Sequence, residues 1–151
     1  MELPLIGVLQ KQLLRGGTSA VREEIKNQER VLRFVLENID SVPELEALLL
    51  LWQHRPVAWN LEELAKRLYI SPEQTHAILA ELSRKQLVVP GTDLPDTFSY
   101  HSSSEERDHL IEETASVYRR EIIRISTLIH SKPSAAIRDF ARAFRFTKEN
   151  P

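Results

Sequence analysis

Apolar residues recur at helical spacing along most of the chain. Between residues 19 and 39 they fall on one side of a predicted helix, with charged residues opposite. That side carries Ile25, Leu32, Val35 and Ile39. A second run follows Ser41 and ends at Pro56, and its apolar positions at i, i+3, i+4 and i+7 are Leu45, Leu48, Leu49 and Trp52. The pattern predicts a mainly α-helical protein.

Three helix starts follow one another between residues 41 and 74. Each has a capping Ser or Asn with Glu or Gln three residues later: Ser41 with Glu44, Asn60 with Glu63, and Ser71 with Gln74. The second start opens a short helix. The third has Pro at its first position and opens a helix that runs to about residue 85. Its inward-facing residues are Thr75, Ile78, Leu79 and Leu82.

The helical pattern stops after this third helix. Residues 87–89 form a short β-prone run, residues 90–96 are rich in turn formers, and residues 97–100 alternate as a returning strand does. We therefore predict a small β-hairpin with a loop at its tip. This hairpin is expected to cover the open side of a core made by the three short helices.

The longest predicted helix starts near Ser102 and runs to about His130. Its apolar residues are separated by 4, 3, 4, 3 and 4 positions, which is the a/d spacing of a coiled coil. These seam residues are Ile111, Ala115, Tyr118, Ile122, Ile125 and Ile129. Because such a helix extends beyond a small domain, we predict that the seam forms a homodimer interface. The alternative is that the seam packs on the core of its own chain.

A final helix is predicted over residues 135–146. Its apolar stripe includes Ile137, Phe140 and Phe144, which we assign to the same dimer interface. Residues 132–149 contain five basic and two acidic residues, a net charge of +3. A basic amphipathic helix can also lie on a membrane, bind in a partner's groove or contact DNA phosphates. The narrow apolar stripe favours the dimer interface.

These elements divide the chain into four parts. Residues 1–18 form an N-terminal arm that contains the helix-stopping pair Gly16-Gly17. Residues 19–40 form an N-terminal dimerisation helix, and residues 41–101 form the three-helix core with its hairpin. Residues 102–151 contain the long helix and the final helix, both assigned to dimerisation.

Composition excludes several classes of protein. Lys and Arg total 20 against 22 Asp and Glu, so a polybasic surface is excluded. The chain has no cysteine and therefore no disulfide, thiolate metal site or cysteine nucleophile. No apolar run approaches the roughly 20 residues that span a bilayer. The first residues lack the basic leader of a signal peptide. We expect a cytoplasmic protein that does not bind membranes.

No set of residues indicates catalysis. His101, Glu105, His109 and Glu112 recur at nearly helical spacing, but they do not complete a four-ligand metal site, and a solvated helix face is the favoured interpretation. The other histidines have no neighbouring nucleophile and orienting acid, and the chain has no Gly-rich phosphate loop. We therefore expect a binding protein that is not an enzyme and needs no cofactor or metal.

The stretch from Ser41 to Tyr100 resembles a winged helix-turn-helix. The resemblance is carried by residues 61–65, by Ser71-Pro72 and by residues 81–88. With the flanking helices, the order of elements is similar to that of MarR-type bacterial transcriptional regulators. This resemblance implies a dimer that sets the second helix of each pair in the DNA major groove, and a wing arginine in the minor groove. The sequence departs from the pattern here, because residues 87–101 contain two aspartates and no Lys or Arg.

The same resemblance defines candidate contacts with double-stranded DNA. Gln and His can hydrogen-bond base edges, whereas Lys and Arg can contact phosphates. The candidate DNA-binding residues are Lys66, Arg67, Gln74, His76, Arg84 and Lys85. The charges of residues 72–86 cancel, however. A second hypothesis is therefore a winged-helix protein-protein interaction module without DNA binding, which recognises another regulatory protein through the uncharged face around Ala77 and Ala80.

Overall fold

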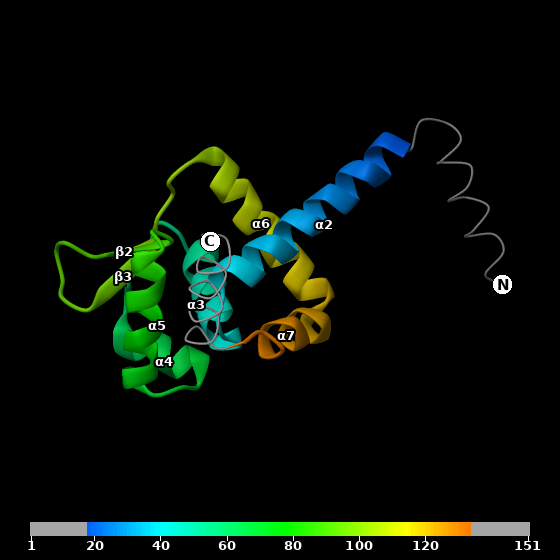
Figure 1. Cartoon of the computed structure of the whole chain (residues 1–151). Coiled ribbons are helices and arrows are strands. Elements are labelled where there is room, and N and C mark those ends of the chain that lie inside the picture. Colours follow the sequence, from blue (N-terminus) through cyan, green and yellow to red (C-terminus); the bar gives the residue numbers. More distant parts are fainter. Residues whose placement is uncertain (1–17, 134–151) are drawn as a thin grey trace, which may run out of the picture.

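A computed structural model describes residues 18–133 (Figure 1). Its helices and strands are α2 (Thr18–Asn38), α3 (Val42–Gln53), β1 (Trp59–Asn60), α4 (Leu61–Leu68), α5 (Pro72–Arg84), β2 (Val88–Pro90), β3 (Thr97–Tyr100), α6 (Glu105–Arg120) and α7 (Ile122–His130). Apart from Thr18, the predicted N-terminal arm lies outside the described residues. The predicted final helix, with Ile137, Phe140 and Phe144, also lies outside them.

The three predicted helix starts are confirmed by their caps. The Ser41 hydroxyl accepts a hydrogen bond from the Glu44 N–H at 3.2 Å, and the Asn60 side chain accepts one from the Glu62 N–H at 2.8 Å. At α5 the capping box is reciprocal, because the Ser71 hydroxyl accepts from the Gln74 N–H and the Gln74 side chain accepts from the Ser71 N–H. Each cap satisfies a backbone donor that the helix leaves without a partner.

The core of the winged helix-turn-helix lies between α3, α4 and α5. Its central side chains have no exposed surface: Leu45, Leu48, Leu51, Leu64, Leu79 and Leu82. Thr75 is also buried, and its hydroxyl donates to the Ser71 carbonyl at 2.9 Å. The inward face predicted for α5 is therefore confirmed, with Ile78 half-buried at its edge.

The predicted hairpin is confirmed and has a third strand. Strand β3 pairs with β2 in antiparallel register, with Val88 opposite Tyr100, and it pairs on its other side with β1. The strand order is β1-β3-β2. Sequence reasoning missed β1 because a two-residue strand shows no periodicity. The mainly α-helical, winged fold class is thus correct (Figure 1).

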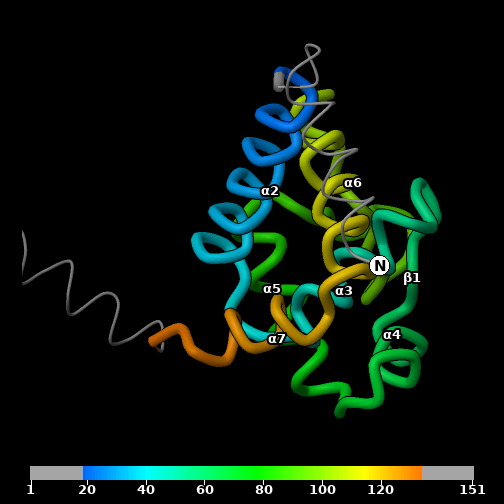
Figure 2. Tube along the Cα trace, turned by 90° about the vertical axis from the view of Figure 1, so that its right-hand side faces the viewer, coloured from blue at the N-terminus to red at the C-terminus, as the bar shows by residue number. Residues whose placement is uncertain are grey.

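The prediction of one long helix over 102–130 is wrong. The helix breaks at Glu121, whose backbone φ of −131° and ψ of 48° are not helical, and the two parts are α6 and α7. Helix α2, with 21 residues, is longer than either part. Both α6 and α7 pack against α2 and α3 (Figure 2). The break lets the two segments follow different directions across the same core.

The predicted seam between two chains needs a corresponding correction. Ile111, Ala115, Ile125 and Ile129 are at most 7% exposed and lie in the core of their own chain. Val31, Phe34 and Val35 of α2 belong to the same buried set. Side chains buried in this way have no surface to offer a second chain, so the alternative of packing on the chain's own core holds for these four.

Apolar side chains remain exposed at the start of α7. Ile122 is 51% exposed and Ile123 is 82% exposed. Helix α2 exposes Ile25 and Leu36 in addition. Of the six seam residues, Ile122 and the half-buried Tyr118 are therefore the two that solvent reaches.

A side-chain cluster joins the end of the sheet to α6. The buried Tyr100 donates its hydroxyl to Asp108 Oδ1 at 2.8 Å, and the Ser102 hydroxyl donates to Asp108 Oδ2. These two hydrogen bonds, first that from Ser102 and then that from Tyr100, hold the pKa of Asp108 below its ordinary value of 3.8. They thereby favour the ionised carboxylate.

Replacing Tyr100 with Phe should lower the free energy of unfolding at pH 7 by about 1 kcal/mol, because one hydrogen bond is lost and the carboxylate that accepts it is partly exposed to solvent. A carboxyl group whose pKa is lowered by folding stabilises the fold above its unfolded pKa and loses that effect as the pH falls. The difference between wild type and variant should therefore shrink below about pH 4. Urea unfolding at pH 7 and pH 3 measures this. An equal difference at both pH values would contradict the role of the Asp108 charge.

Candidate nucleic-acid interface

A tight turn connects α4 to α5. Tyr69 ends α4 in the left-handed conformation, with φ 57° and ψ 39°, and the Ile70 N–H donates to the Ala65 carbonyl at 3.2 Å. Ser71 then caps α5. Three residues therefore reverse the chain, and α5 packs across α4 with one side of its surface in solvent.

The exposed side of α5 matches the sequence prediction. Gln74, His76, Ala77 and Ala80 are all exposed, whereas the positions between them face the core. Gln and His can recognise base edges through hydrogen bonds, and alanine methyl groups can contact the methyl group of thymine. The exposed face of α5 therefore has polar side chains near its N-terminal end and small side chains further along. It can approach a groove or a flat surface of a partner closely.

The predicted phosphate contacts of α4 lie beside the turn. Lys66 and Arg67 are exposed in the last turn of α4. The Arg67 guanidinium carbon is 5.7 Å from the centroid of the Trp59 ring, close enough for a cation–π contact. Lys66 lines a hollow of about 440 Å³ together with Tyr69 and Pro72. The structure thus brings Lys66 to the start of α5.

Tyr69 is a candidate contact that sequence reasoning missed. Its side chain is 92% exposed, although aromatic side chains generally bury surface. Its left-handed backbone is uncommon for a bulky residue. The signal in the sequence was a Tyr two residues before the Ser71-Pro72 helix start, at a helix end where a Gly is usual.

The two cations at the end of α5 differ in their surroundings. The Arg84 side chain is 69% exposed and pairs with Glu81 at 2.8 Å, and the hydrogen bond from Arg84 lowers the pKa of Glu81. Lys85 is turned inward. Its side chain is 11% exposed, and its ammonium group lies 2.6 Å from Glu44 Oε1.

The structure therefore corrects the prediction that Lys85 contacts DNA. Burial raises the pKa of the Glu44 carboxyl, and the hydrogen bond and charge of Lys85 oppose that rise. The ammonium group is thus used to balance a buried carboxyl within the chain. Of the six candidate residues, Lys66, Arg67, Gln74, His76 and Arg84 remain on the surface.

The wing carries acidic and apolar side chains at its tip. Asp93 and Asp96 are exposed, and Leu94 is 65% exposed. The loop is held by the Gly91 N–H, which donates to the Thr97 carbonyl at 2.7 Å. A negatively charged tip of this kind is repelled by phosphates.

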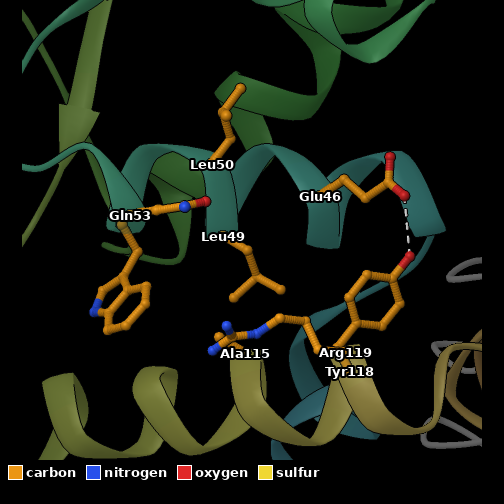
Figure 3. Close-up of a pocket in the computed structure, with 8 residues that line it drawn as sticks. Glu46, Leu49, Leu50, Gln53, Ala115, Tyr118 and Arg119 are labelled. Atoms are coloured by element: carbon orange, nitrogen blue, oxygen red, sulfur yellow. Dashed lines mark hydrogen bonds between the residues drawn. The ribbon is translucent and has the colours of Figure 1, made fainter.

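A pocket lies between the winged-helix core and the helix that follows it. It has a volume of about 280 Å³ between α3 and α6, and its apolar lining includes Leu49, Leu50 and Ala115 (Figure 3). The Tyr118 hydroxyl donates to Glu46 at 3.0 Å across one end. Burial and this hydrogen bond raise the pKa of Tyr118 to about 12. The volume is near the lower end of the range for small-molecule pockets.

The histidine series near residue 101 forms no metal centre in the described part of the chain. His109 lies 3.8 Å from Glu112 and 3.7 Å from Glu113 on the surface of α6. Between residues 18 and 133, no group of three or more His, Asp or Glu residues could hold a metal ion. Within the same residues, no helix has the length and apolar character needed to cross a membrane.

Comparison with models of known protein families gives no match, and comparison with curated proteins gives none either. Several solved structures are similar. RV1404 from Mycobacterium tuberculosis is 23% identical, with 96% of this chain and 93% of that chain covered and a TM-score of 0.45. A mutant of MepR from S. aureus, solved with an oligodeoxyribonucleotide, is 17% identical, with coverages of 87% and 94% and a TM-score of 0.47.

A third similar structure is the multiple antibiotic-resistance repressor MarR from Listeria monocytogenes. It is 16% identical, with 99% of this chain and 97% of that chain covered and a TM-score of 0.44. All three scores lie below 0.5. The winged-helix assignment therefore rests on the helices, turn and sheet of this chain itself.

Proposed function

We propose that the chain is a winged-helix transcriptional regulator that binds double-stranded DNA as a homodimer in the bacterial cytoplasm. The observation that carries this proposal is the exposed face of α5, which presents Gln74 and His76 directly after a helix-turn-helix turn flanked by Lys66 and Arg67. In a MarR-type regulator, which the sequence resembles, this is the helix that enters the major groove.

In the proposed complex, α5 reads bases and α4 holds the phosphates. The Gln74 amide and His76 imidazole reach base edges, and the small Ala77 and Ala80 side chains let the helix approach the groove closely. Lys66 and Arg67 contact the neighbouring backbone. Two α5 helices related by a two-fold axis then meet half-sites about 34 Å apart.

The acidic wing limits the number of phosphate contacts. Asp93 and Asp96 stand where a wing arginine is expected, so the wing adds no cation to the interface. Each phosphate contact contributes about 0.9 to the slope of log affinity against log salt concentration. We therefore propose a shallow salt dependence, set mainly by α4.

The direct experiment measures fluorescence anisotropy of a labelled duplex of mixed sequence as the protein is added, first at low salt and then at raised salt. Binding that weakens with salt supports the proposal. The absence of binding even at low salt favours the second function below.

Replacing both Lys66 and Arg67 with Ala should weaken DNA binding for all sequences and reduce the salt slope by about 2, about 1 for each lost phosphate contact. Titration of the same duplex at several salt concentrations checks this. Lys26→Ala on the exposed surface of α2 is the matched control and should leave the slope unchanged. If the double variant keeps the wild-type slope, the phosphates are held by other residues.

A second candidate function is recognition of another protein without DNA contact. It is favoured by the exposed Leu94 between two aspartates of the wing, and by the uncharged Ala77 and Ala80 on α5. Both features suit a basic, partly apolar protein surface better than a phosphate backbone.

A further inference from the structure

Two lysine side chains from separate parts of the chain meet at the C-terminal end of α2. Lys85 follows α5, and Lys132 follows α7. Their side chains are 11% and 5% exposed, although lysine is rarely buried unless it is paired. Both ammonium groups are directed at the same short connection between α2 and α3.

Lys85 joins the end of α5 to this connection by three contacts. Its ammonium group donates to the Asn38 carbonyl and to Glu44 Oε1, the latter at 2.6 Å, and it lies 3.5 Å from Asp40 Oδ2. Glu44 is itself fixed, because its other oxygen accepts from the Asp40 N–H at 3.2 Å. The first turn of α3 is therefore part of the same network.

Lys132 reaches the same connection from the end of α7. Its ammonium group donates to the Val35 carbonyl at 3.2 Å and to the Ile39 carbonyl, and it lies 3.8 Å from Asp40 Oδ1. The Val35 carbonyl also accepts from the Ile39 N–H at 3.0 Å, and a cation at this end of α2 interacts favourably with the helix dipole. Lys132 thus closes α2 and fixes the end of α7 to it.

Asp40 is shared by the two lysines, one through each carboxylate oxygen. The side chains of Lys85 and Lys132 are largely buried. Solvent and salt therefore screen their electrostatic interactions with this carboxylate less than they screen ion pairs on the surface. A displacement of α7 along α2 changes the position of Lys132 and, through Asp40, the charge that Lys85 faces.

We infer that Lys85, Asp40 and Lys132 form a coupling point that sets the position of α5 relative to α2 and α7. Lys85 is a positioning residue in this scheme, because it acts on the exposed face of α5 through the backbone and does not touch the bound partner. A change in the packing of α7 is transmitted to α5 by this route. The role of α5 as a recognition helix rests on the proposed function. The coupling between α7 and α5 does not require DNA.

The chain suits a distance measurement because it contains no cysteine. Nitroxide labels are attached at Ala77→Cys on α5 and Thr127→Cys on α7, both of which are exposed positions. Labelled protein is diluted into excess unlabelled protein, so that distances between chains do not contribute. Pulsed electron-electron double resonance then gives the distribution of distances between the two labels. It is measured in wild type, Lys132→Met, Asp40→Asn and the double variant. Lys26→Met is the control.

The Lys132→Met and Asp40→Asn variants should each broaden the distribution or shift its mean by about 1–2 Å, the scale of helix shifts in coupled proteins. Because both act through one carboxylate, Lys132→Met should have little added effect in the Asp40→Asn background. The partly exposed Asp40 can be replaced by its neutral isostere with the fold kept, which circular dichroism verifies. Wild-type distributions in the folded Asp40→Asn variant, or fully additive effects, would overturn the inference.

Discussion

Replacing Lys85 with Met should lower the free energy of unfolding at pH 7 by about 3–5 kcal/mol, the usual cost of removing one partner of a buried ion pair. The reason is Glu44, which is 3% exposed and, when ionised, loses the ammonium group that lies 2.6 Å away in the wild type. Lys66→Met on α4 is the matched control, because that lysine is exposed, and it should change stability little. Urea unfolding followed by circular dichroism measures both.

The loss in Lys85→Met should depend on pH. Burial raises the pKa of Glu44 even in the wild type, and the variant lacks the hydrogen bond and charge that oppose this rise. A carboxyl group with a raised folded-state pKa favours the fold below its unfolded pKa and loses this effect as the pH rises. The deficit should therefore be largest at pH 7 and smaller at pH 5. Adding Glu44→Leu should recover part of it, and a deficit independent of pH would contradict this role of the Glu44 charge.

Replacing Ile122 with Glu should convert the proposed dimer to single chains. Ile122 and Ile123 expose 51% and 82% of their surface side by side at the start of α7, which makes them apolar candidates for an interface. A carboxylate buried without a partner between two chains costs several kcal/mol. Because Ile122 is half-exposed in the single chain, the variant should keep its fold.

Light scattering at micromolar concentration measures this change in mass. The matched control is Ile125→Glu, three residues along α7, which places the charge in the core of the chain and should unfold it. A wild-type mass of one chain would contradict the dimer. A dimeric and folded Ile122→Glu variant would place the interface on other residues.

Local signals predicted the winged-helix core well, because the elements there are specified by residues close in sequence. Ser41, Asn60 and Ser71 cap helices through contacts with residues two or three positions away. The buried face of α5 follows directly from helical spacing. The spacing of apolar residues in a helix or strand predicts which of its sides is buried.

For the seam in the second half of the chain, helical spacing could not predict which surface the apolar face packs against. The a/d spacing identified four buried positions, Ile111, Ala115, Ile125 and Ile129, but the spacing is the same whether they pack on a second chain or on α2 and α3. The break at Glu121 has neither Gly nor Pro nearby. It is set by tertiary packing, which overrides the helical preference of the sequence.

The burial of two lysines could not be predicted for a similar reason. The hydrogen bonds of Lys85 span 41 to 47 residues, and those of Lys132 span 93 and 97 residues. A lysine at a helix end is usually a solvated cation. Only the tertiary fold brings Asp40 and Glu44 to these side chains.

We propose that the exposed face of α5 reads DNA sequence. Fragments of the source genome are incubated with wild type and with a Gln74→Ala, His76→Ala double variant, and the retained fragments are sequenced. We expect wild type to retain one class of sequence, and the double variant to lose preference at the base positions that these side chains contact. Failure of wild type to retain any class even at low salt, or an identical retained class for both proteins, would contradict it.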